Sequence, residues 1–119
     1  MSRTHNLTAI LPCNDVAKSA AFYARLGFTQ RNGDEEYLIL ADGRGGELHL
    51  QPAVEGWLVP GRNPFGLYLY SENVDELATV MGCKAEEKPW GMYEFALSDP
   101  DETLVRVGWP MRLRAAQAG

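Results

Sequence analysis

The segment that decides the fold is residues 14–28, which read Asn14-Asp15-Val16-Ala17-Lys18-Ser19-Ala20-Ala21-Phe22-Tyr23-Ala24-Arg25-Leu26-Gly27-Phe28. Asn14 or Asp15 can cap the start of a helix, because their side chains accept backbone N–H bonds. Apolar side chains then recur at helical spacing as far as Leu26. Gly27 stands where a helix commonly ends in a left-handed residue. The segment therefore predicts one amphipathic helix that begins after a turn.

Strand-like stretches flank this helix on both sides. They cover residues 4–12, 28–32, 36–41 and 47–51. The turns Asn32-Gly33-Asp34 and Asp42-Gly43-Arg44-Gly45-Gly46 separate the last three stretches, which is typical of hairpins. The first half of the chain is therefore expected to form a strand, a helix and three further strands.

The same order of elements returns after a proline-rich connection at residues 52–64. Strands are expected over residues 65–71, 83–85, 93–97 and 104–108. A short helix is expected after Asn73, which caps it, and Gly82 ends it; Glu76 stands at the capping-box position. From residue 111 the tail is expected to fray or to form a short helix.

Two sequence matches support an internal repeat. Leu11-Pro12-Cys13-Asn14-Asp15-Val16 aligns with Leu69-Tyr70-Ser71-Glu72-Asn73-Val74 at an offset of 58, and Leu40-Ala41-Asp42 aligns with Leu97-Ser98-Asp99 at an offset of 57. We expect a single domain over residues 1–119, with one repeat at about 4–52 and the other at about 64–110; a chance match is the alternative. Because each half-sheet buries one face under a helix, the other faces are expected to form a shared concave surface for a ligand.

Length and charge exclude several classes of protein. With 119 residues and no apolar run near the roughly 20 needed to cross a bilayer, we expect one soluble domain without a membrane partner. The net charge of −5 argues against nucleic acid and favours a cationic small ligand. No hydrophobic signal segment follows Met1, so a reducing cytoplasm is expected, with Cys13 and Cys83 packed as small core residues.

Residues 14–28 resemble the opening of the vicinal oxygen chelate superfamily, which includes glyoxalases, bleomycin resistance proteins and extradiol dioxygenases. Pro89-Trp90-Gly91-Met92-Tyr93-Glu94-Phe95-Ala96-Leu97-Ser98-Asp99-Pro100-Asp101 resembles the closing half of its bleomycin-resistance branch. With the repeat, the resemblance covers the chain to about Pro110. It implies an α+β fold in which two βαβββ repeats form an open, cupped mixed sheet with helices outside, paired as a homodimer. Glu102 departs from the family, which usually places a glycine after Asp-Pro-Asp.

The resemblance also implies four positions where the superfamily's enzymes hold a divalent metal. In this sequence they fall on Thr8, His49, Gly66 and Arg106. Glycine has no side chain, arginine stays cationic, and threonine is a poor ligand for zinc, iron or manganese. We therefore expect no metal and no other cofactor.

His49 is left with two roles that the sequence does not separate. It contributes hydrogen bonding or stacking to a ligand, or it is a strand histidine satisfied by neighbours such as Glu47 or Gln51. The sequence contains no nucleophile-elbow or phosphate-loop motif. Metal-free acid–base chemistry by His49 or Glu47 stays open, because such groups need only placement and a tuned pKa.

Side-chain alternation assigns aromatic residues to the proposed concave face. Tyr37, Tyr68 and Tyr70 share that face with His49 and Arg106, and Trp90 is expected beside them. The opposite face is uniformly aliphatic, as a helix-covered core requires: Leu38, Leu40, Leu48, Leu50, Leu67, Leu69, Val105 and Val107. The alternative for the tyrosines is ordinary strand filling.

In the bleomycin-binding members that this chain resembles, aromatic residues at the positions of Tyr37 and Trp90 flank the drug's planar bithiazole, and acids at the rim meet its cationic tail. The resemblance assigns the acidic role to Asp34 and Glu35, beside Glu36; a solvated turn is the alternative. Two further residues have two interpretations each. Trp57 is a lid or a dimer contact, and Pro12 is a hinge for exchange of the first strand or part of a strand-ending turn.

The leading hypothesis is a binding protein without catalytic residues that sequesters a planar, cationic aromatic compound of the bleomycin type. A metal-dependent lyase, isomerase or dioxygenase is the alternative, and it requires a shifted register that brings His5, Glu47 or Glu94 into the site. A third possibility is the same fold acting on an unrelated metabolite.

Overall fold

The computed structural model describes residues 3–118. These residues form two compact units that divide between Val59 and Pro60. We refer to residues 3–59 as unit 1 and to residues 60–118 as unit 2. No helix within the described part of the chain is long and apolar enough to cross a membrane.

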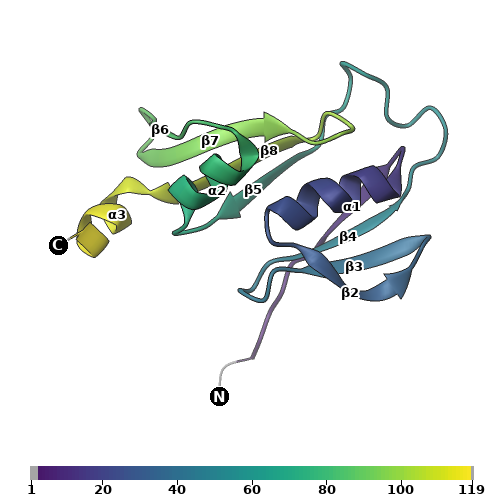
Figure 1. Cartoon of the computed structure of the whole chain (residues 1–119), viewed down its shortest axis with the longest axis horizontal. Coiled ribbons are helices and arrows are strands. Elements are labelled where there is room, and N and C mark those ends of the chain that lie inside the picture. The colour runs from purple at the N-terminus through teal and green to yellow at the C-terminus, as the bar shows by residue number, and fades with distance from the viewer. Residues whose placement is uncertain (1–2, 119) are drawn as a thin grey trace. The chain divides into compact units, whose positions relative to one another are not determined.

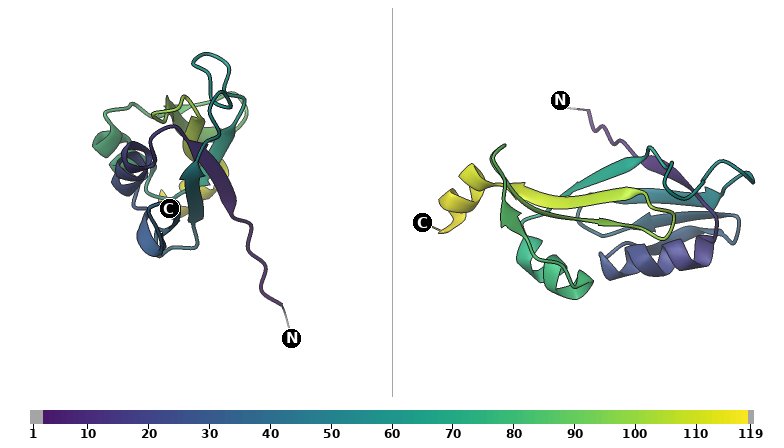
Figure 2. Two further views of the ribbon diagram at one scale, coloured as in Figure 1. Left: turned by 90° about the vertical axis from the view of Figure 1, so that its right-hand side faces the viewer. Right: turned by 90° about the horizontal axis from the view of Figure 1, so that it is seen from above.

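Unit 1 is a four-stranded mixed sheet with one helix on one of its faces (Figure 1). Its elements are β1 (Ala9–Cys13), α1 (Val16–Arg25), β2 (Thr29–Asp34), β3 (Tyr37–Ala41) and β4 (Glu47–Pro52). The strand order is β1-β4-β3-β2, with β1 parallel to β4 and the other pairs antiparallel. Residues 3–8 run outward from β1 (Figure 2).

Unit 2 repeats this plan. Its elements are β5 (Gly66–Tyr70), α2 (Val74–Met81), β6 (Glu86–Glu87), β7 (Met92–Ser98) and β8 (Leu104–Pro110), followed by α3 (Met111–Ala118). The strand order β5-β8-β7-β6 has a parallel β5–β8 pair and antiparallel pairs elsewhere. Helix α2 covers one face of this sheet, and α3 continues directly from the end of β8 (Figures 1 and 2).

Strand register confirms the internal repeat. In unit 1 Ala9 pairs with Leu48, and in unit 2 Leu67 pairs with Val105, which reproduces the offsets of 58 and 57. Equivalent turns are also built alike. Asp42 Oδ1 accepts the backbone N–H groups of residues 44 and 46, and Asp99 Oδ1 accepts those of residues 101 and 103. The fold is therefore the predicted α+β arrangement of two βαβββ units.

The core follows the predicted alternation. Leu38, Leu40, Leu48 and Leu50 are buried in unit 1, and in unit 2 Val105 and Val107 are buried while Leu67 and Leu69 are half-buried. The helices supply the other side of each core. Tyr23 and Leu26 come from α1 and its end, and Val74, Ala78 and Met81 come from α2. Alternation predicted these residues well, because one-sided burial of a strand forces a period of two.

The helix ends are set as local chemistry predicts, with one exception. Asp15 caps α1 by accepting the N–H of Lys18 at 3.1 Å. Gly82 directly follows α2, and Gly27 follows Leu26, the C-cap of α1; both glycines have positive φ, of +69° and +99°. Asn73 precedes α2, but the prediction that its side chain caps the helix is wrong, since it makes no capping hydrogen bond.

Three strand predictions need correction. The first strand begins at Ala9 rather than residue 4, and residues 83–85 form no strand, since β6 is Glu86–Glu87. Residues 32–34 do not form a turn but lie within β2, and the turn falls at residues 35–36. The reason is that Asp34 Oδ1 accepts the N–H groups of Glu36 and Tyr37, which moves the hairpin turn toward the C-terminus.

Candidate ligand-binding faces

In each unit, the sheet face away from the helix carries some of the predicted site residues. On β3 and β4, every second side chain is buried and the intervening ones are partly exposed. Tyr37 and His49 belong to the partly exposed set of unit 1, and Tyr68 and Arg106 to that of unit 2.

On the unit 1 face, His49 is held between Tyr37 and Glu47. The Tyr37 hydroxyl lies 2.8 Å from His49 Nδ1, and Glu47 Oε1 lies 3.0 Å from His49 Nε2. The two rings meet edge to face with their centroids 5.3 Å apart. The second oxygen of Glu47 accepts the side-chain N–H of Asn6 at 3.3 Å. His49 is therefore satisfied by Glu47, as one of its two interpretations predicts, and also by Tyr37.

The direction of these two hydrogen bonds depends on the tautomer of His49. In the tautomer that carries its proton on Nε2, the ring donates to Glu47 and its Nδ1 accepts from the Tyr37 hydroxyl. The Tyr37 hydroxyl is thus engaged by His49, and its ring is fixed from the hydroxyl end.

The acidic residues near Tyr37 divide by role. Asp34 organises the β2–β3 turn through the two backbone bonds described above, although its side chain is exposed. Glu35 and Glu36 are also exposed. One carboxylate oxygen of Asp34 is thus used in hydrogen bonds within the turn, as the turn interpretation predicts, and the carboxylates of Glu35 and Glu36 face solvent.

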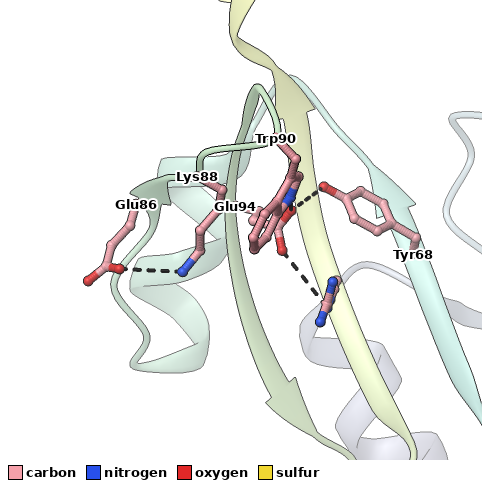
Figure 3. Close-up of polar contacts among 6 residues, drawn as sticks. Tyr68, Glu86, Lys88, Trp90 and Glu94 are labelled. Atoms are coloured by element: carbon pink, nitrogen blue, oxygen red, sulfur yellow. Dashed lines mark hydrogen bonds and ion pairs between the residues drawn. The ribbon is translucent and has the colours of Figure 1, made fainter.

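The unit 2 face is centred on Glu94, which is only 2% exposed (Figure 3). Its Oε1 accepts the Tyr68 hydroxyl at 3.0 Å and the Trp90 indole N–H at 2.9 Å. Arg106 Nε lies 3.9 Å from Oε2, and this nitrogen is buried without a hydrogen-bond partner. Burial, and next the hydrogen bond to Glu94, raise the pKa of the Tyr68 hydroxyl well above its ordinary value of 10.0. Tyr68, Trp90 and Arg106, which the sequence analysis predicted as site residues, therefore converge on this carboxylate.

Glu94 is the residue that sequence reasoning missed. It entered only under the metal-dependent alternative, yet the repeat held a signal for it. The offset of 57 carries Tyr37 to Glu94 and His49 to Arg106. The registers agree, since Ile39 pairs with His49 where Ala96 pairs with Arg106. A phenol–imidazole pair in unit 1 thus corresponds to a carboxylate–guanidinium pair in unit 2.

Trp90 occupies the tip of the β6–β7 hairpin. The loop Pro89-Trp90-Gly91 is closed by bonds from Lys88 N to Met92 O at 2.7 Å and from Gly91 N to Lys88 O at 3.0 Å. Gly91 has φ of +85°, which suits a glycine. The Trp90 side chain is 59% exposed even though its N–H is bonded. Its neighbour on the face, Tyr68, packs on Tyr70 with ring centroids 4.6 Å apart.

Trp57 belongs to the long connection, within unit 1, and it is 60% exposed. The neighbouring Leu58 is buried and its carbonyl accepts the side-chain N–H of Asn14 at 3.3 Å. This anchors the segment beside Trp57 and leaves the indole on the surface.

The four positions implied for a metal do not fit a divalent ion. Thr8 precedes β1, and Gly66 begins β5 without a side chain to offer. His49 has both nitrogens engaged, and Arg106 keeps a cation beside Glu94. Within residues 3–118, no group of three His, Cys, Asp or Glu side chains is arranged to hold a metal ion.

Comparison with known proteins gives a consistent family. No family model and no curated protein sequence matches the chain. Among solved structures, it is similar to a bleomycin-binding protein complexed with bleomycin, at 30% identity and a TM-score of 0.77, over 89% of this chain and 98% of that one. A bleomycin resistance determinant encoded on the transposon Tn5 matches at 30% identity and 0.77, over 90% and 98%.

A more distant structure shares the fold alone. Lactoylglutathione lyase from Agrobacterium tumefaciens matches at 19% identity with a TM-score of 0.69, over 91% of this chain and 95% of that chain. The repeat, the register of its two sheets and the two matches at 30% identity agree with one another. The chain belongs to the vicinal oxygen chelate superfamily, in its bleomycin-resistance branch.

Proposed function

We propose that this protein binds a planar, cationic aromatic small molecule of the bleomycin type and sequesters it without a metal and without turnover. The observation that carries the proposal is Trp90, a tryptophan more than half exposed at a hairpin tip and yet fixed by a hydrogen bond to a buried carboxylate. An exposed and ordered indole offers a flat surface for stacking.

The polar groups of the two proposed stacking residues are already occupied. The Tyr37 hydroxyl is hydrogen-bonded to His49, and the Trp90 N–H is bonded to Glu94. Because both polar groups are engaged within the protein, what each residue offers a ligand is its ring. This favours recognition of flat aromatic or cationic groups over recognition through a hydrogen-bond code.

The charge balance favours a cation. The net charge is −5, and the exposed Glu35 and Glu36 directly precede Tyr37. The positive charge of Arg106 is opposed by Glu94. A solved relative at 30% identity holds bleomycin, which supports this ligand class for the present chain.

We further propose that the chain acts as a homodimer in which Asp34, Tyr68, Tyr70 and Trp57 border the ligand contacts of Tyr37 and Trp90. The family resemblance is the basis for proposing a dimer, and the exposure of Trp57 and Tyr70 is compatible with it. Light scattering coupled to size exclusion should give the mass of two 13.2 kDa chains. A monomer at all concentrations would contradict the dimer.

Calorimetric titration with metal-free bleomycin tests the binding function. We expect saturable binding to the parent protein and at least about tenfold weaker binding to Trp90→Ala, since a central tryptophan commonly contributes more than about 1.4 kcal/mol. Trp109→Phe is the matched control, because residue 109 alternates with Gly108 and lies on the opposite face of β8. Absence of binding by the folded parent would overturn the proposed ligand.

A further inference from the structure

We infer that Glu94 is a positioning residue, whose buried carboxylate holds the Trp90 indole in its binding orientation before any ligand arrives. The consequence for affinity rests on the proposed function. The fixing of the indole does not, because it is a property of the unliganded chain.

The backbone of Trp90 is constrained on both sides. Pro89, directly before Trp90, has a fixed φ, and Gly91, directly after it, takes the left-handed conformation that lets the hairpin close. Residues 88 and 92 are joined by a short backbone bond, and Gly91 O accepts the N–H of Met111 at 2.9 Å. The position from which the side chain projects is therefore set by the hairpin and by the end of β8.

Among the described residues, the Trp90 side chain makes one hydrogen bond, to Glu94. The acceptor is itself buried and held in place, because Glu94 lies on the central strand β7, is 2% exposed, and receives the Tyr68 hydroxyl on the same oxygen. The 2.9 Å bond from the indole nitrogen then restricts both torsions of a ring that is otherwise largely in solvent (Figure 3).

Trp90 does not need this bond for its own solvation. At 59% exposure its N–H can reach water, so the carboxylate changes the freedom of the ring more than its hydration. A ring held in the bound orientation avoids an ordering cost when a ligand stacks on it. Such a cost for one side chain amounts to about three- to tenfold in affinity.

Trp57 provides an internal control in the parent protein. It is 60% exposed, close to the 59% of Trp90, but its indole nitrogen has no hydrogen-bond partner among residues 3–118. In nitrogen-15 spectra of unliganded protein, with peaks assigned by Trp57→Phe and Trp90→Phe, the Trp90 indole proton should exchange with solvent about tenfold more slowly than that of Trp57. Equal exchange and equal mobility of the two indoles would overturn the inference.

Variants at Glu94 test whether its carboxylate causes the slow exchange of the Trp90 indole proton. Glu94→Leu removes the acceptor, and we expect the Trp90 indole proton to exchange as fast as that of Trp57. Glu94→Gln keeps an oxygen acceptor and should retain slow exchange. Glu86→Gln is the matched control on the same hairpin, since Glu86 contacts Lys88. Unchanged slow exchange in a folded Glu94→Leu would contradict the role; if that variant does not fold, the Trp90–Trp57 comparison still decides.

A double-mutant cycle links positioning to binding. Glu94→Leu should weaken bleomycin binding about three- to tenfold in the parent, and have no effect in a Trp90→Phe background, where there is no N–H to hold. Equal losses in both backgrounds would mean that Glu94 acts only through the structure of the sheet. If the parent binds no bleomycin, the proposed function fails while the exchange measurements still decide the positioning role.

Discussion

Glu102 has a left-handed backbone, with φ of +65°, in the turn that joins β7 to β8. A non-glycine residue in this region is strained. The side chain offsets the strain, because its carboxylate accepts the backbone N–H of Gly61 at 2.6 Å and so connects the turn to the 52–64 segment. The departure from the family's glycine therefore keeps the glycine-like conformation and adds a contact.

Substitutions at Glu102 separate the two effects. Glu102→Ala keeps the strained conformation and loses the bond to Gly61, so its free energy of unfolding should fall by about 1 kcal/mol. Glu102→Gly loses the same bond but relieves the strain, and it should be more stable than Glu102→Ala by about 1 kcal/mol. Urea unfolding measures both, and an alanine variant as stable as the glycine variant would contradict a strained turn.

Tyr68 gives the unit 2 face a dependence on alkaline pH. Its pKa is raised by burial and by Glu94, so the folded state keeps the phenol protonated where the unfolded chain releases its proton. The associated stability is complete below the ordinary pKa of 10.0 and is lost as the pH rises above it. The slope for one such proton is at most about 1.4 kcal/mol per pH unit.

Urea midpoints between about pH 9 and 11 test this effect. Tyr68→Phe should lose stability less steeply than the parent protein over that range. The pKa of Tyr93 is also raised, first by its hydrogen bond to Asp75, so a slope should persist in Tyr68→Phe and become shallower when Tyr93→Phe is added. Parallel curves for the parent and Tyr68→Phe would contradict the assignment.

At the scale of elements, periodicity predicted faces well and ends poorly. Leu38, Leu40, Leu48 and Leu50 were assigned correctly because burial on one face imposes alternation. The β2–β3 turn was misplaced because Asn-Gly-Asp is a common turn sequence, and the side-chain bonds of Asp34 decide the geometry. Glu94 was not predicted as the centre of the unit 2 face because a charged side chain on a strand is expected to be exposed. Its burial is predictable only when the groups that donate hydrogen bonds to it are known.

Gly33 tests the corrected turn. It has φ of +91° within β2, where the register shifts between Gln30 and Asn32, and a Cβ there would collide with the carbonyl oxygen of Tyr37. Gly33→Ala should therefore cost about 3 kcal/mol and displace the start of β3. Gly45 is the control, since it has φ of +106° but open space around it, and Gly45→Ala should cost about 1 kcal/mol.

The measurements for Gly33→Ala and Gly45→Ala are their free energies of unfolding and the environment of Tyr37. The Gly33→Ala variant should also weaken the Tyr37–His49 bond, which is visible as a shift of the His49 ring resonances. Equal costs at the two glycines would show that the turn lies elsewhere and that the backbone of Tyr37 does not constrain Gly33.

At the scale of the whole chain, the two repeats carry faces with the same register and different chemistry. Corresponding positions carry Tyr37 and Glu94, and His49 and Arg106. In unit 1 the Tyr37 hydroxyl is hydrogen-bonded to His49, and in unit 2 the Arg106 guanidinium lies beside Glu94. Of the two rings proposed to meet the ligand, Trp90 is exposed and Tyr37 is half-buried. The fold alone does not predict this chemistry, because a lactoylglutathione lyase shares the fold at 19% identity.

The donor chemistry makes a prediction for the whole protein. A dication about 4 Å from a guanidinium is repelled by several kcal/mol even at an effective dielectric constant of about 20. His49 has both nitrogens engaged by Tyr37 and Glu47, so binding a metal there would also break two hydrogen bonds. Protein purified without chelator should therefore carry far less than one zinc, iron, manganese or nickel ion per chain by elemental analysis. Prior dialysis against a chelator should leave the affinity for metal-free bleomycin unchanged. About one retained ion per chain, lost on dialysis together with binding, would favour the metal-dependent enzyme instead.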